Sequence, residues 1–336
     1  MAQTLAGTSA APGAPTRPGN PWVARARAAF TGTGGALLGL IVIVVVFSLA
    51  SPYFFTGRNL LNIVDQITVL GILAIGGTAV IITGGIDLSV GSVLALSTMV
   101  LGYLAHDGGQ PMWVAMIVSV LVGAAAGALN GIAITLAKLP PFIATLAMMS
   151  IARGLANLIT NGQQIIGYPV WFDDLSSNRM AGFLSVTVIV LIVLYVAGWA
   201  FLRYRSTGRA LYAIGGSDEV ARLAGINVKR ITALVYVAAG ALAAVAGIVL
   251  ASRLDSSQPT AGTGYELDVI AAVVIGGASL TGGVGRLTGT LVGVLIIGVL
   301  RNGLNLLGVS PFLQSIMIGV VIAGAVMADV LRRRKA

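Results

Sequence analysis

The 336-residue sequence contains no cysteine, a single histidine and only 9% charged residues. Without cysteine there can be no disulfide, no zinc–thiolate site and no thiol catalysis, and the redox compartment cannot be inferred. The histidine, His106, lies beside Asp107 in a short polar segment and is most simply a solvated loop residue. The sequence also has no GxxxxGKS/T phosphate loop, no metal-ligand cluster and no nucleophile elbow. We therefore expect no enzymatic activity, and no metal or cofactor bound by this chain.

Hydrophobic residues, in contrast, make up 57% of the chain, and the mean hydropathy is +0.96. Soluble domains carry roughly 25% charged residues. The composition therefore predicts an all-α polytopic protein embedded in a lipid bilayer. The net charge of +9 does not indicate a nucleic-acid partner, because the basic residues flank apolar runs, where membrane topology explains them.

Ten apolar runs have the length and composition expected of membrane spans. They are residues 34–50, 61–83, 87–105, 112–136, 141–161, 183–202, 231–251, 268–281, 287–305 and 311–330. The eighth run is short and contains Gly276-Gly277, so we expect it to be bent, broken or merged with the ninth run. Residues 1–30 are predicted to form a disordered cytoplasmic tail, and residues 31–336 a single transmembrane domain.

The distribution of basic residues predicts the orientation of these spans. With a cytoplasmic N-terminus, 15 of the 20 lysines and arginines fall on the cytoplasmic side, as the positive-inside rule requires. The even number of spans then places both termini and the polar segment 203–230 in the cytoplasm.

Two halves of the chain show a weak internal repeat. Residues 83–87 (TGGID) are similar to residues 263–268 (TGYELD), and Asn130-Gly131 and Pro141-Phe142 are similar to Asn302-Gly303 and Pro311-Phe312. In the ten-span topology the members of each pair face opposite sides of the membrane. This pattern indicates an inverted repeat of spans 2–5 and 7–10, a common plan in alternating-access transporters. An alternative alignment of Gly84-Gly85 on Gly276-Gly277 keeps the orientation but needs a gap and leaves the later pairs out of step.

The polar segment 203–230 separates the two halves. Gly215-Gly216-Ser217 is interpreted as a loop, with Ser217 and Asp218 capping a short helix that ends at Gly225. Val220, Leu223 and Ala224 form an apolar stripe on that helix. We expect this helix to lie across the membrane face, where a partner can bind it.

Polar residues within the spans are costly in hydrocarbon and suggest a substrate path. The candidates are Asn62, Asp65, Gln66, Thr145, Arg153, Asn157, Asn302 and Gln314. Such side chains could bind the hydroxyl groups of a small neutral solute such as a sugar. Equally, they could hydrogen-bond neighbouring helices as packing contacts. Two further carboxylates, Asp87 and Asp268, each precede or begin an apolar run, and helix capping explains them best. Glycines at spacing four, as in Gly123-Gly127-Gly131, predict close helix packing.

Residues 219–225 (EVARLAG) resemble the E-A-A-x-x-x-G signature of importer permeases of the ATP-binding-cassette class, with Val220 in place of the first alanine. Four more stretches resemble the ribose-type sugar permeases of that class: GGIDLSVGS (84–92), PPFIATL (140–146), STGRALYAIGG (206–216) and AAVVIGGASL (271–280). The likeness covers roughly residues 50–330.

This resemblance implies a monosaccharide permease subunit of a bacterial inner membrane, with ribose as the first candidate sugar. It also implies a second permease chain, most simply an identical one, a cytoplasmic ATPase that binds ATP and Mg²⁺, and an extracytoplasmic sugar-binding protein. The residues implied in ATPase coupling are Ser217, Asp218, Glu219, Ala221, Arg222, Leu223, Gly225 and Ile226.

Two other classes of function compete with this interpretation. An ion-coupled secondary carrier or channel acting alone is suggested by the inverted repeat and by Asp65 and Arg153 within the spans. An intramembrane enzyme has no nucleophile, acid–base pair or metal set in the sequence to support it. Sugar or ion flux through this chain alone would distinguish the carrier from the permease subunit.

Overall fold

The structure is a computed structural model that describes residues 33–180, 182 and 184–333, and the predicted tail 1–30 lies outside them. The helices are α2 (Thr33–Ala50), α3 (Gly57–Ile82), α4 (Val90–Gly102), α5 (Met112–Thr135), α6 (Pro141–Thr160), α7 (Val170–Ser177), α8 (Val186–Tyr204), α9 (Ser206–Gly216), α10 (Asp218–Leu223), α11 (Val228–Leu254), α12 (Tyr265–Ile275), α13 (Leu287–Leu306) and α14 (Pro311–Arg333). A π-helical turn, η1 (Tyr103–Asp107), continues α4. Two antiparallel pairs of two-residue strands complete the chain: β1 (Ile165–Ile166) with β4 (Ser256–Ser257), and β2 (Arg179–Met180) with β3 (Leu184–Ser185).

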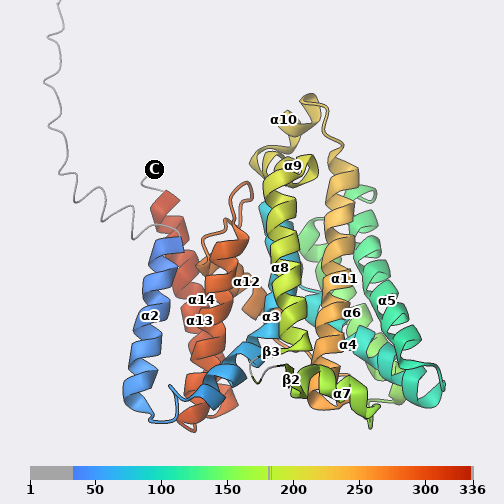
Figure 1. Cartoon of the computed structure of the whole chain (residues 1–336). Helices are drawn as coiled ribbons and strands as arrows, with labels where there is room; N and C mark the ends of the chain where they lie inside the picture. Colours follow the sequence, from blue (N-terminus) through green and yellow to red (C-terminus); the bar gives the residue numbers. More distant parts are fainter. Residues whose placement is uncertain (1–32, 181, 183, 334–336) are drawn as a thin grey trace, which may run out of the picture.

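Most of the helices are membrane spans by length and composition. Within the described residues, seven are long and apolar enough to cross a bilayer: α3, α4 with η1, α5, α6, α8, α11 and α13. The other three predicted runs coincide with α2, α12 and α14, so each of the ten runs contains a helix. Figure 1 shows these helices side by side in one bundle, with α9 and α10 at one end and α7 at the other.

The eighth predicted run, 268–281, is broken rather than continuous. Helix α12 ends at Ile275, and residues 276–286 form a loop in which Gly277, Gly282 and Gly283 all have positive φ. That backbone conformation is disfavoured for residues with a Cβ and stops a helix. The third run also starts later than predicted, because α4 begins at Val90 after non-helical residues that follow Gly84 (φ +78°).

The helix order bears out the internal repeat. In each half a long helix (α3, α11) is followed by a glycine with positive φ (Gly84, Gly264), a short helix (α4, α12) and a long helix (α5, α13). Each half closes with a helix that starts at proline, α6 at Pro141 and α14 at Pro311. Helices α3 and α11 run in opposite directions through the bundle (Figure 1), which is the arrangement of an inverted repeat.

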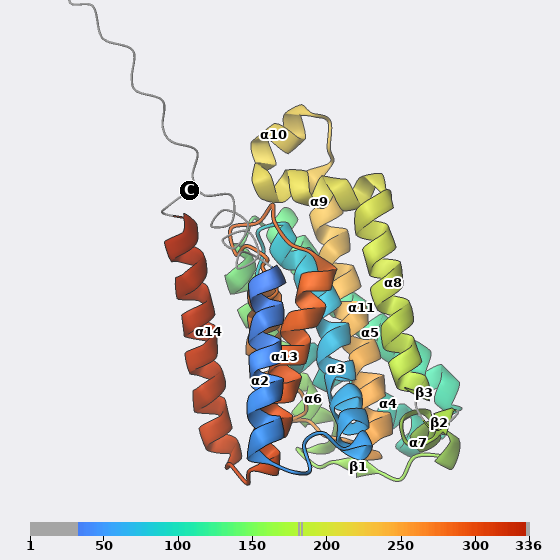
Figure 2. The ribbon, with the colours of Figure 1, turned by 60° about the vertical axis from the view of Figure 1, so that its left-hand side comes forward.

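The first helix, α2, lies outside this repeat. It packs beside α13 at the edge of the bundle (Figure 2), where the ring of Phe47 covers Gly303 so closely that a Cβ there would clash with it. The start of α2 and the end of α14 lie at the end of the molecule that carries α9 and α10 (Figures 1 and 2).

Glycines on α5 allow its backbone to approach α11 directly, as the spacing of four predicted. A Cβ added at Gly123 would meet the backbone of Gly240, and one at Gly127 would clash with the carbonyl of Tyr236. Because the hydrophobic effect does not drive helices together within lipid, such close packing supplies much of the attraction between helices in a membrane.

Replacing Gly127 by alanine tests this contact. Because the obstructing atom is backbone, G127A should destabilise the fold by about 3 kcal/mol, the upper end of typical overpacking costs. The matched control is G154A in the interior of α6, where an added Cβ meets nothing within 4 Å. Alanine there should be neutral or stabilising by up to about 1 kcal/mol. Thermal unfolding in detergent compares the two, and equal melting temperatures would contradict the inferred close packing.

Candidate functional site

The segment between α8 and α11 folds into two helices outside the bundle (Figure 1). Helix α9 extends through Gly215 and Gly216, so the prediction of a loop at these residues was wrong. The chain breaks only at Ser217, whose extended backbone (φ −163°) separates α9 from α10. Gly215 is required because the backbone of the bundle lies too close for a Cβ, and not because the chain turns there.

Helix α10 forms as the sequence predicted. The hydroxyl of Ser217 accepts a hydrogen bond from the N–H of Val220 (3.3 Å) and caps the helix. Asp218 and Glu219 occupy the first turn, where the helix dipole favours carboxylates. Gly225 terminates the helix with φ +81°, and the N–H of Ile226 donates to the carbonyl of Ala221 (3.0 Å).

The apolar stripe of α10 points away from the rest of the chain. Val220 is 64% exposed and Leu223 84% exposed, whereas Ala221 is 2% exposed and packs inward. Arg222 lies 3.7 Å from Asp218 in an exposed pair of little energetic weight. Two exposed aliphatic side chains thus lie next to each other on the outer face of this polar segment.

The C-terminal end of α9 contacts the bundle through backbone atoms. At Gly215 an added Cβ would clash with the carbonyl oxygen of Ile82, at the end of α3, and with the backbone nitrogen of Gly283. The N–H of Gly283 donates to that same Ile82 carbonyl (2.9 Å). Three segments therefore meet here without intervening side chains: the end of α3, the end of α9 and the loop 276–286.

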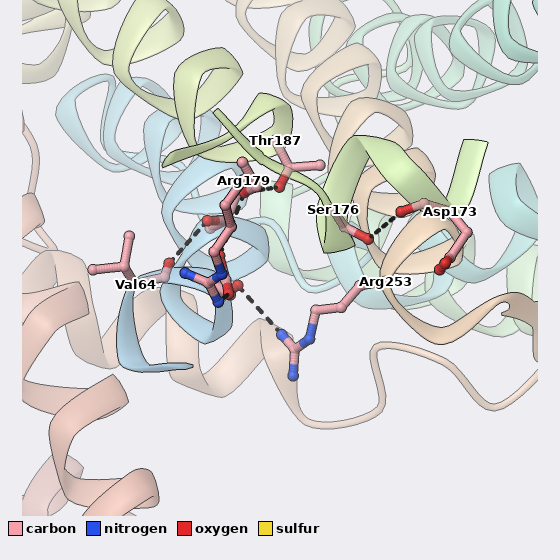
Figure 3. A network of polar contacts seen from close by, with 9 residues as sticks. Val64, Asp173, Ser176, Arg179, Thr187 and Arg253 are labelled. Atoms are coloured by element: carbon pink, nitrogen blue, oxygen red, sulfur yellow. Dashed lines mark hydrogen bonds and ion pairs between the residues drawn. The ribbon is translucent and has the colours of Figure 1, made fainter. Parts of the chain in front are cut away.

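At the opposite end of the molecule, Asp65 is the centre of a polar network. Its carboxylate accepts from Arg179 at 2.6 Å and from the hydroxyl of Ser185 at 3.4 Å, and its backbone carbonyl accepts from Arg253 at 3.3 Å. Figure 3 shows both guanidinium groups turned toward the turn of α3 that contains Val64. Asp65 thus joins α3 to the β2–β3 hairpin and to the end of α11.

Nearby, the segment after α6 is held to the end of α11. The N–H of Tyr168 donates to the carboxylate of Asp255 (3.0 Å), and its hydroxyl is bonded to that of Ser257. Burial raises the pKa of Tyr168 to about 12, so this hydroxyl stays protonated and available as a donor.

Helix α6 supports both non-helical segments that precede the short helices. The hydroxyl of Thr145 donates to the carbonyl of Ile86 (3.1 Å), ahead of α4. The guanidinium of Arg153 donates to the carbonyls of Pro259 (2.6 Å) and Ala261 (2.9 Å), ahead of α12. Irregular backbone at membrane depth needs such partners because lipid supplies none.

The other candidates of the substrate path are distributed over the bundle. Asn157 donates to the carbonyl of Arg153 (2.8 Å), and Asn302 exchanges two amide hydrogen bonds with Asn59 (2.9 Å each). Gln314 donates to Asn305 (2.7 Å) and to the Val309 carbonyl (2.9 Å).

Six of the eight candidates thus have partners within the chain, which favours the packing interpretation for them. On the same face of α3 as Asp65, the side chains of Asn62 and Gln66 make no hydrogen bond within the described part of the chain, and Asn62 is exposed. The substrate path itself stays a prediction. In the described ranges no group of three or more His, Asp or Glu could hold a metal ion.

The sequence did not reveal several of these contacts. Asp268 does not cap α12 but pairs with Arg301 on α13 at 2.6 Å, whereas Asp87 accepts from the N–H and hydroxyl of Ser89 directly before α4. The carbonyl partners of Arg153 and the backbone contact at Gly215 also carry no local sequence signal, because they join residues far apart in the chain.

Comparisons with known proteins agree with this description. The model of the family described as branched-chain amino acid transport system / permease component matches residues 59–326. The chain is 47% identical to the ribose import permease protein RbsC of Bacillus subtilis, over 88% of this chain and 92% of that protein. Identity is 45% to the protein of the same name in Escherichia coli K12, with the same coverage. The D-allose transport system permease protein AlsC of Escherichia coli K12 is 38% identical, over 88% of this chain and 90% of that protein. No solved structure matches the chain.

Gly215 and its neighbour Gly216 provide a matched test of the contact between α9 and the bundle. G215A should displace the loop 276–286, since overpacking against backbone costs about 1–3 kcal/mol. G216A should change little, because a Cβ there meets nothing within 4 Å. Hydrogen–deuterium exchange of the loop residues measures the effect: exchange should accelerate in G215A only. Equal protection in both variants would contradict the contact.

Proposed function

We propose that this chain, which belongs to the permease family whose model it matches, is the membrane-spanning subunit of an ATP-binding-cassette importer for ribose. As a member of that family with many apolar helices, it is a multi-pass protein of the inner membrane. The sugar assignment is supported by the two relatives named as ribose import permeases. The relative named for D-allose makes that hexose the first competitor.

The observation that carries the proposal is the geometry of α10. Its exposed Val220 and Leu223 form a small apolar surface outside the bundle, on the side of the predicted cytoplasmic termini. We assign the cytoplasmic ATPase, with its ATP and Mg²⁺, as the partner that binds this apolar surface. Residues 217–226 then form the coupling helix, which Ser217 caps at its start and Gly225 terminates.

The contact at Gly215 gives that movement a route into the bundle. Since α9 meets the end of α3 and the loop 276–286 through backbone atoms, a displacement of α9 and α10 acts directly on both halves of the repeat. An inverted repeat can then rock between outward-open and inward-open states.

Two further partners complete the importer. A sugar-binding protein is expected on the side of α7 and the β2–β3 hairpin, opposite α10. A second copy of the chain is proposed for the exposed apolar face of α14, where Phe312, Ile316 and Val320 recur at spacing four.

A substitution on α10 tests the docking surface. L223D should weaken association with the ATPase at least tenfold, because it would bury an unpaired carboxylate in an apolar contact. V170D is the matched control: Val170, on α7 at the opposite end, is 76% exposed. Co-purification of the ATPase, measured against the amount of inserted permease, reports the outcome. Undiminished association of L223D would remove α10 from the interface.

Reconstitution tests the transport activity. Liposomes containing this chain and the ATPase subunit should hydrolyse ATP faster when the partner binding protein is added with ribose, and less so with D-allose. Stimulation by D-allose alone would reassign the substrate within the same class. Sugar or ion flux by this chain without any ATPase would instead favour the ion-coupled carrier.

A further inference from the structure

A cavity of about 650 Å³ opens at the end of the bundle that carries α9 and α10. It lies between the last turns of α8, helix α9 and the start of α13. Its lining residues include Trp199, Arg203, Arg209, Tyr212 and Arg286. Three of these are arginines and none is an aspartate or glutamate, so the cavity concentrates positive charge. Its volume is in the range of small-molecule sites.

The guanidinium groups of this cavity are poorly paired. Arg209 donates to the backbone carbonyl of Tyr204 at 3.3 Å. Within the part of the chain that the structure describes, the side chains of Arg203 and Arg286 have no hydrogen bond or ion pair. Tyr212 is held in place by donating to the carbonyl of Gly285 (3.0 Å). All three arginines are exposed, so their N–H donors are accessible to an anion with several acceptor oxygens.

The surface that leads to the cavity is apolar and exposed. Ile192, Val196, Trp199 and Arg203 occur on α8 at spacings of four, three and four, so they form one column along a single face of the helix. The first three are exposed in the structure. The column therefore runs from aliphatic side chains through an indole to a guanidinium, which is the polarity gradient of one membrane leaflet.

We propose that this cavity binds the phosphate group of an anionic phospholipid, with the acyl chains lying along the exposed column of α8. The charge of the cavity matches a phosphodiester, and Trp199, one turn before Arg203 on α8, is of a residue type enriched at membrane interfaces. Because Arg209 and Tyr212 of α9 line the cavity, the bound lipid contacts the helix that precedes α10. The assignment does not depend on which sugar the chain carries.

Native mass spectrometry of the full-length chain in detergent tests the site. Phosphatidylglycerol should bind the wild-type chain more tightly than phosphatidylcholine. R203Q/R286Q should lower that affinity roughly 25-fold, since each arginine near an anionic lipid surface contributes a factor of about five. R203K/R286K keeps both charges and should retain most of the binding. K229Q/R230Q removes the same charge from exposed positions at the start of α11 and should bind like the wild type.

A second arm distinguishes a lipid from a soluble anion, because both carry the same phosphate chemistry. Millimolar inorganic phosphate should neither displace phosphatidylglycerol nor appear as an adduct of the delipidated chain. Displacement or a phosphate adduct would overturn the lipid assignment in favour of a soluble anion. An equal loss in K229Q/R230Q, or equal affinity for both lipids, would overturn the site. Loss of ATPase association in R203Q/R286Q with unchanged lipid binding would assign the cavity to the ATPase interface.

Discussion

The structure depends on one constraint: backbone groups that are not in a helix must find hydrogen-bond partners inside the membrane-embedded bundle. The chain departs from helix before α4 and before α12, where it passes through glycines with positive φ. Helix α6 supplies partners at both places, through Thr145 and Arg153. One helix therefore stabilises the irregular segments of both halves of the repeat, although it belongs to only one of them.

Close backbone contacts determine which parts of the molecule can absorb a small displacement and which cannot. Along the α5–α11 contact, and at Gly215, atoms of one backbone rest against atoms of another. Side-chain rotamers can absorb small displacements, but backbone against backbone has no such freedom. In contrast, Val220 and Leu223 of α10 are exposed, so a partner can contact these side chains without displacing others, while the backbone contact at Gly215 passes any movement of the segment to the bundle.

Features with a local cause could be predicted from the sequence. Composition and hydropathy predicted the spans, and the caps at Ser217 and Gly225 predicted α10, because each depends on residues close together in the chain. The interpretation of Gly215-Gly216 as a loop failed because glycine has two uses, turns and close approach, and only the tertiary structure distinguishes them. The partners of Arg153, Asp268 and Asp65 lie far away in the sequence. One of them, Arg179, is on a two-residue strand that is too short to show a hydrophobic pattern. No pattern within a single sequence signals such pairs.

The position of α2 has a consequence for biosynthesis. Its described neighbour, α13, begins more than 200 residues further along the chain, so at ordinary translation rates α2 is made on the order of ten seconds or more before α13. During that interval the surface of α2 that later packs on α13 faces lipid or the insertion machinery. A span with one polar face would be a poor occupant of that environment, and α2 is apolar on all sides, with no charged residue along its length. Its apolar surface is therefore stable in lipid before its packing partner is made. Phe47 can contact Gly303 only after the ninth apolar run has entered the membrane.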